Sequence, residues 1–211
     1  MKGILSLLRM NTRGPKHGEE SGDSVFFSTA FAGQGVDDSL LVPWEARAVE
    51  VGAKRLPTSR GGKLLEALWA KDKYMAHLDR DAVERMERFF EFASIPSGRD
   101  VIRQDEYGNF MVVLLTGTIA VDRVQPWGEH LRLAETRPGD ILGEMSLLDS
   151  GIRFSACTTL TDCEIAVLSA EAMDDMMGKD PQLAASLIAL LARKLSLRLR
   201  VVSARLSENQ K

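Results

Sequence analysis

Residues able to hold an anion gather between Pro138 and Ser155, which reads PGDILGEMSLLDSGIRFS. Gly143 and Glu144 open a short helical run there. The first backbone N–H groups of such a helix lack partners and attract anions. Glu144 can accept a hydrogen bond from a hydroxyl group, and the planar guanidinium of Arg153 suits a phosphate. A hydroxyl acceptor beside a phosphate donor predicts a nucleotide site.

The composition is that of an ordinary globular protein. Of the 211 residues, 45% are hydrophobic and 27% are charged, and the net charge is -3. An acidic balance argues against broad electrostatic binding to nucleic acid. No apolar run approaches the roughly 18 residues needed to span a bilayer, and Arg9 interrupts the apolar start of the chain too early for a signal peptide. We therefore expect a cytoplasmic protein without a membrane span.

The residues that most enzymes of small β-barrels require are scattered. The histidines His17, His77 and His130 lie in distant regions, which argues against a metal site. Cys157 and Cys163 fall on predicted strands and are expected to be reduced and packed. No Ser-His-Asp or Cys-His arrangement can be assembled persuasively. We expect no catalysis, no metal and no cofactor.

The N-terminal region, residues 1–62, reads as an extended or partly disordered arm. Glycine, serine, aspartate and proline recur in it, and no hydrophobic period is sustained. Arg47, Arg55 and Arg60 form a loose basic cluster there. Such a cluster is usually a solvated surface, but it could also reach a bound anion.

Residues 63–211 read as one domain with a β-rich centre. Helices are expected over 63–95, with Val83, Met86, Phe90 and Ala93 as a buried stripe. Short strands separated by glycine- and proline-containing turns follow over 98–168. The period then becomes helical again over 169–206. This order predicts a mainly β, α+β fold: a jelly-roll-like β-roll with N-terminal helices and a long C-terminal helix.

The last helix is long enough to serve two purposes. Asp180 followed by Pro181 is a clean helix start, and leucines and a valine line one side as far as Leu206. Packing on the β-roll alone explains part of this stripe. Its length also favours a homodimer through Pro181 to Leu206.

The ordered set of fragments resembles the cyclic nucleotide-binding domain family over about residues 79–206. This family includes catabolite-activator-like regulators and regulatory subunits of kinases. The fragments are Gly98 with Val101-Ile102, Gln104-Asp105-Glu106 with Asp105 at a usual glycine position, Phe110–Val113 before Gly117–Val121, and Pro138-Gly139-Asp140 with Gly143-Glu144. The resemblance implies a β-roll that binds a cyclic nucleotide and moves its last helix to signal to a partner.

The resemblance also implies roles for individual residues. Glu144 would hold the ribose 2′-hydroxyl and Arg153 the cyclic phosphate, with backbone N–H groups near Gly143, Met145 and Ser146 completing the site. An internal ion pair between Glu144 and Arg153 is the plainer alternative.

The sequence departs from the family pattern after Arg153, where Phe154 and Ser155 replace a small residue and alanine. Sliding the register would put Phe154 in the place of the arginine. We keep Arg153, because the downstream apolar positions then align without a gap. Ser155 could offer a hydroxyl group to the phosphate.

Three functions stay open. The domain binds cAMP or cGMP; or it binds cyclic di-GMP, with Phe154 stacking on a base and Arg47, Arg55 or Arg60 clamping a second phosphate; or it is a dimerisation scaffold without a ligand. We expect no direct DNA binding, since no helix-turn-helix follows the last helix before Lys211.

Overall fold

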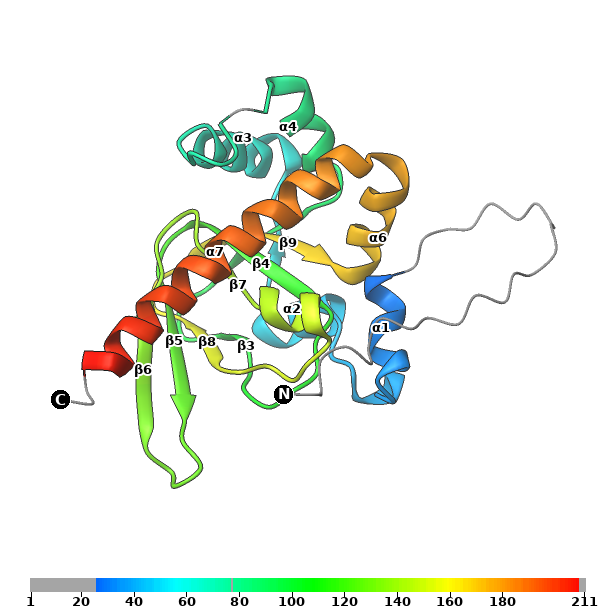
Figure 1. Cartoon of the computed structure of the whole chain (residues 1–211). Helices are drawn as coiled ribbons and strands as arrows, with labels where there is room; N and C mark the ends of the chain where they lie inside the picture. Colours follow the sequence, from blue (N-terminus) through cyan, green and yellow to red (C-terminus); the bar gives the residue numbers. More distant parts are fainter. Residues whose placement is uncertain (1–25, 77, 209–211) are drawn as a thin grey trace, which may run out of the picture.

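The computed structural model describes residues 26–76 and 78–208, and two antiparallel β-sheets form its centre (Figure 1). Its helices are α1 (Phe27–Gly33), the 3-10 turn η2 (Asp38–Leu40), α2 (Trp44–Val51), α3 (Thr58–Trp69), α4 (Arg80–Glu87), α5 (Glu144–Asp149), α6 (Ala170–Lys179) and α7 (Pro181–Glu208). Its strands are β1 (Lys54–Arg55), β2 (Glu91–Ile95), β3 (Asp100–Ile102), β4 (Phe110–Thr116), β5 (Ile119–Val124), β6 (His130–Glu135), β7 (Ile141–Leu142), β8 (Ala156–Thr159) and β9 (Cys163–Ser169).

The strands pair into a five-stranded sheet, in the order β1-β2-β9-β4-β7, and a four-stranded sheet, in the order β3-β8-β5-β6. In Figure 1, α7 crosses the sheets from α6 toward the end near β6. The expected mainly β, α+β architecture with a long C-terminal helix is confirmed.

Strand β4 explains why the chain contains an unbroken apolar run. Phe110, Val112 and Leu114 lie in the cluster between the sheets. The alternate residues, Met111 and Val113 among them, lie in a second cluster with the helices. Successive side chains of a strand point to opposite faces, so a strand covered on both faces must be apolar throughout.

The helical prediction over 63–95 is partly wrong. Helix α3 begins earlier, at Thr58, α4 ends at Glu87, and residues 91–95 form strand β2. β2 pairs with β9, and Phe92 and Ala93 enter different apolar clusters. The spacing of Phe90 and Ala93 suited a helix, but the sheet supplies backbone partners and buries alternate residues.

The described part of the N-terminal arm differs from the expected extended segment. It contains α1, η2 and α2, and the aromatic side chains of Phe27, Phe31 and Trp44 are buried. Contacts with the domain stabilise these short helices, which sequence periodicity did not indicate. The part of the arm before residue 26 lies outside the described residues.

Helix α7 is packed on one face over its first half, as far as Leu195, and is exposed from Ser196 to Ser207. Leu183, Leu187 and Leu191 are buried against α6 and the sheet, whereas Val202 and Leu206 are exposed. Over the residues that the structure describes, α7 and the other helices are too short or too polar to cross a membrane.

Helix α1 is held to the domain by one buried carboxylate of α6. Asp174 accepts hydrogen bonds from the backbone N–H groups of Phe26, Phe27 and Ser28, each at 2.8 Å, and from the Ser28 hydroxyl at 2.7 Å. Burial acts to raise the pKa of Asp174, but these donors outweigh it and hold the pKa below its ordinary value. The carboxylate therefore caps the N-terminus of α1 from another element.

We predict that Asp174→Ala lowers the free energy of unfolding by about 1–3 kcal/mol, because several donors lose one buried acceptor. Urea unfolding measures this loss, and hydrogen exchange should show faster exchange in residues 27–33. Because the folded pKa is lowered, the wild-type contribution is present above pH 3.8 and is lost as the pH falls through the folded value. Asp175→Ala, which removes an exposed partner of Lys179, is the control. Equal stability of the two variants would contradict the assignment.

Candidate functional site

The predicted anion site lies where β7 turns into α5. Gly143 adopts a left-handed conformation with φ of 76°. A Cβ atom added there would lie 2.6 Å from Nη1 of Arg153. Both the backbone conformation and the approach of the guanidinium therefore require glycine at this turn.

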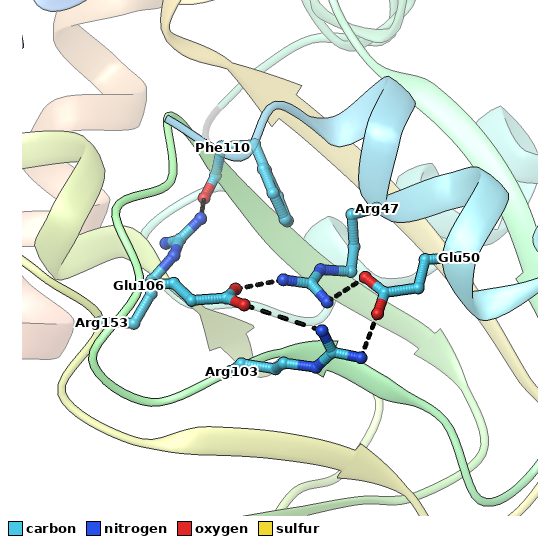
Figure 2. Close-up of polar contacts among 6 residues, drawn as sticks. All are labelled: Arg47, Glu50, Arg103, Glu106, Phe110 and Arg153. Carbon is cyan, nitrogen blue, oxygen red and sulfur yellow. Dashed lines mark hydrogen bonds and ion pairs between the residues drawn. The ribbon is translucent and has the colours of Figure 1, made fainter. Parts of the chain in front are cut away.

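Arg153 is buried, with 3% of its surface exposed, and is held by main-chain carbonyls. Its Nη1 donates to the Gly143 carbonyl at 2.8 Å. Its Nη2 donates to the Phe110 carbonyl at 2.7 Å (Figure 2). The guanidinium also lies 4.7 Å from the centre of the Phe110 ring. Within the described residues, no carboxylate forms an ion pair with Arg153. The site thus presents a buried cation that backbone dipoles solvate.

The backbone of Arg153 is fixed by the loop after β3. Its N–H donates to the Glu106 carbonyl at 2.8 Å, and its carbonyl accepts from the N–H of Asp105 at 2.9 Å. Asp105 has φ of 64°, the conformation that glycine adopts readily. This explains why the family pattern has glycine at the position of Asp105.

Burial lowers the pKa of Arg153 to about 10, and the positive charge of Arg47 contributes to the lowering. The guanidinium nevertheless remains charged at neutral pH. A charge removed from water without an opposite charge is unfavourable unless a ligand or further hydrogen bonds compensate it. The electrostatics of this position therefore favour an anion.

Glu144 begins α5 and is also buried, at 3% exposure. It forms an ion pair with Arg198 of α7, whose Nη2 donates to the Ile141 carbonyl at 2.8 Å. Burial raises the pKa of Glu144, and the charges of Arg198 and Arg153 oppose that rise. The alternative of an ion pair between Glu144 and Arg153 is wrong, because the partner of Glu144 is Arg198.

Phe154 and Arg153 point to opposite sides of the chain. Phe154 is 51% exposed, and its ring lies 4.1 Å from the guanidinium carbon of Arg123, which donates to the Phe154 carbonyl. Ser155, the next residue, is partly buried. The structure thus places Arg153, rather than Phe154, inside the fold.

Met145 and Ser146, the other residues expected at the start of this helix, differ in their exposure to solvent. The Ser146 side chain is buried, at 2% exposure, whereas Met145 is 44% exposed. Of the residues expected at the helix start, Glu144 and Ser146 are therefore buried like Arg153, whereas Met145 faces solvent.

A second arginine, Arg47 of α2, lies beside this site. It is 1% exposed and forms ion pairs with Glu50 and Glu106 (Figure 2). Arg103 pairs with the same two carboxylates and closes a ring of alternating charges. The Nε atom of Arg47 is buried and has no hydrogen-bond partner among the described residues.

The other two arginines of the predicted cluster lie elsewhere. Arg60 pairs with Glu164 at 2.6 Å and lines an open groove with Lys54. Arg55 is exposed on β1, where it pairs with Ala93 of β2. The structure therefore brings Arg47 to Arg153 but separates Arg55 and Arg60 from it.

Two kinds of residue that could support catalysis are a reactive thiol and a cluster of metal ligands. Burial raises the pKa of Cys157 to about 12, so its thiol is protonated at neutral pH and is a poor nucleophile. Among residues 26–76 and 78–208, no three His, Cys, Asp or Glu side chains come together as metal ligands.

Sequence reasoning did not identify Arg198, Glu106 or Trp44 as part of the site. For Arg198 a signal existed, since it follows the buried Leu191 by seven residues and therefore lies on the same face of α7. Glu106 stands in the family fragment Gln104-Asp105-Glu106, but nothing in the sequence indicated its ion pair with Arg47. For Trp44 no signal existed, because its partners are far away in sequence.

We predict that Arg198→Ala makes the stability depend more steeply on pH. Glu144 has a raised folded pKa, so the stabilisation from its protonation is present below pH 4.5 and is lost as the pH rises through the folded value. Without the positive charge of Arg198, the folded pKa of Glu144 rises further. Urea unfolding should therefore show an additional loss of about 1–2 kcal/mol between pH 5 and 8.

The double variant Glu144→Gln with Arg198→Ala is the control, since it removes the titrating group. The free energy of unfolding of this double variant should not show the steeper dependence on pH that is expected for Arg198→Ala. Parallel pH curves for wild type and Arg198→Ala would contradict the ion pair.

Comparison with known proteins identifies the domain that carries this site. Residues 92–180 match the model of the cyclic nucleotide-binding domain. The "CRP-like cAMP-activated global transcriptional regulator" of Mycobacterium tuberculosis is 24% identical over 131 residues, which are 62% of this chain and 58% of that protein. The "Cyclic AMP receptor protein" of Thermus thermophilus is 32% identical over 107 residues, 51% of this chain and 50% of that protein.

A solved structure agrees with the fold. A cyclic nucleotide-binding domain from Methylobacillus flagellatus has a TM-score of 0.66 at 22% identity, covering 72% of this chain and 86% of that one. The chain spans about half the length of the curated relatives that it matches. Residues 92–180, which contain Gly143, Glu144 and Arg153, belong to the cyclic nucleotide-binding domain family.

Proposed function

We propose that this domain binds a cyclic mononucleotide, cAMP or cGMP, and signals without catalysis. The observation that carries the proposal is Arg153: a buried, charged guanidinium that donates to two carbonyls and pairs with no carboxylate of the described residues, beside Gly143 in the family's domain. Two relatives are named for cAMP. The phosphate would pair directly with this guanidinium, which forms no ion pair with a carboxylate of the described residues.

The chemistry of the two side chains suits the two parts of the ligand. A guanidinium can make two parallel, charge-assisted hydrogen bonds to a phosphate, stronger than those to neutral carbonyls. Glu144 can accept a hydrogen bond from the ribose 2′-hydroxyl. To do so it must share its carboxylate with Arg198 or give up that ion pair.

The ion pair between Glu144 and Arg198 is the proposed route from the site to α7. A ligand hydroxyl on Glu144 changes the interaction that holds this part of the helix. The position of α7 then changes only as far as the ligand binds the two positions with different affinity. We propose that this movement reaches a downstream protein or a second copy of the chain.

The exposed end of α7 is the proposed contact surface. Leu199, Val202 and Leu206 are exposed by 67%, 51% and 61%, and their spacing places them on one face. Such a stripe is typical of helices that pair.

If two copies pair through this stripe, Val202→Glu should convert a dimer to a monomer in sedimentation experiments. A carboxylate at the helix pair would be desolvated, which weakens association by about tenfold or more. Ala204→Glu, on the opposite face, should stay dimeric. A monomeric wild type would contradict pairing between copies.

A second candidate ligand follows from Arg47. Its unpartnered Nε and its place beside Arg153 would suit a second phosphate, as in cyclic di-GMP. Arg60 and Arg55 line other surfaces than the space between Arg47 and Arg153. A scaffold without a ligand is the third reading, and it predicts no binding at all.

Calorimetry and thermal shift with cAMP, cGMP and cyclic di-GMP test these readings. We expect cAMP or cGMP to bind and to raise Tm, because a ligand of the native state alone stabilises it. Arg153→Lys loses the bidentate geometry and should weaken binding by about 30-fold, or about 2 kcal/mol. Arg137→Lys, an exposed arginine before β7, should bind as wild type.

Circular dichroism must first show that Arg153→Lys is folded, since the residue is buried. Glu144→Gln provides a second variant, expected to weaken binding by about tenfold. Tight cyclic di-GMP binding without cAMP or cGMP binding would favour the second candidate. If none of the three nucleotides binds, the result would favour the third function, a scaffold without a ligand.

A further inference from the structure

Helix α2 enters the space next to the proposed site. Trp44, its first residue, is 4% exposed and belongs to the apolar cluster between the sheets. Its ring meets the Phe110 ring edge-on, with 5.6 Å between the ring centres. Phe110 is also the residue whose carbonyl accepts from Arg153. The helix therefore packs directly against the surroundings of the proposed phosphate residue.

The segment before α2 and the helix itself are tied to the loop that holds Arg153. The Val42 N–H donates to the Tyr107 carbonyl at 2.9 Å, and Arg47 pairs with Glu106. The Glu106 carbonyl in turn accepts from the Arg153 N–H. The arm thus contacts the same loop that fixes the backbone of Arg153.

The space between the two arginines is closed. Val42 and Arg47 of the arm line it together with Ile102, Phe110 and Arg153, and it has no volume open to a water molecule. Pockets for small ligands generally take about 300–1,000 Å³. The space next to the Arg153 guanidinium is therefore too small to hold a nucleotide while α2 is in place.

Some of the interactions between α2 and the rest of the domain are unfavourable. Arg47 and Arg153 carry like charges that face one cavity, and the buried Nε of Arg47 lacks a hydrogen-bond partner in the part of the chain that the structure describes. Helix α2 has eight residues, too few to be stable in isolation. It depends on Trp44 and on the ring of charges around Glu50.

We infer that α2 is an intramolecular gate, which covers Arg153 in the ligand-free protein and must leave for a cyclic nucleotide to bind. The inference rests on the proposed function. The affinity for nucleotide is then reduced by the fraction of molecules in which the gate is open. Any change that weakens the contacts of α2 without touching the site raises that affinity.

Glu50→Lys tests the gate. Glu50 pairs with Arg47 and Arg103 but does not line the closed space. A lysine there repels both arginines and should release α2. The control is Glu45→Lys, the same charge change at an exposed position of the same helix.

Two measurements detect the release of α2 from the domain in the absence of nucleotide. Hydrogen exchange of residues 44–51 should be about tenfold faster in Glu50→Lys than in wild type, because opening exposes these amides. Phenylglyoxal labelling, read by peptide mass spectrometry, should increase at Arg153. Unchanged labelling of Arg153 despite faster exchange would overturn the gate.

The third measurement is calorimetry with cAMP and cGMP. Glu50→Lys should bind about five- to tenfold more tightly than wild type, and Glu45→Lys within about twofold of it. Equal affinity in wild type and Glu50→Lys, or slower exchange of residues 44–51 when nucleotide is added, would overturn the gate. The latter result would mean that α2 closes over the ligand with Arg47 in contact.

Failure of the proposed function has a different signature. In that case Arg153 becomes accessible in Glu50→Lys, yet neither protein binds a nucleotide. The labelling result then supports the inference that α2 covers Arg153, whereas the absence of binding contradicts the proposal that the ligand is a cyclic nucleotide.

Discussion

The buried guanidinium of Arg153 is the constraint on which the rest of the site depends. A cation inside a protein must be solvated by the protein itself, and here the carbonyls of Gly143 and Phe110 do so. This requirement explains the glycines around it, since a Cβ at Gly108 or Gly143 would lie within 2.7 Å of a guanidinium nitrogen. It also explains why Phe110 and the turn after β7 must lie side by side.

The same site is linked to both ends of the described chain. Glu144 connects it to α7 through Arg198, and Glu106 connects it to α2 through Arg47. Each link is an ion pair between residues more than fifty positions apart in sequence. An anion at Arg153 would alter the electrostatic surroundings of both pairs, so binding can affect both the N-terminal arm and the C-terminal helix.

The sequence predicted the parts of this arrangement that are local. The turn at Gly143, the acidic start of α5, the spacing to Arg153, the strand β4 and the start of α7 at Pro181 all follow from patterns within about twenty residues. The missed parts are non-local. The sequence pattern predicts a helix over the residues of β2, because only their pairing with β9 shows them to be a strand. Helix α2 has no long amphipathic period, and the sheets that bury Trp44 lie far along the chain.

The most direct test of the account observes Arg153 itself during a titration with nucleotide. Proton–nitrogen NMR spectra of the arginine side chains report each guanidinium, and the Arg153 signal can be assigned by its loss in Arg153→Lys. The account predicts that the Arg153 Nε–Hε signal shifts on addition of cAMP or cGMP and saturates with the calorimetric affinity, while the signal of the exposed Arg137 stays in place. An unchanged Arg153 signal under saturating nucleotide would contradict it.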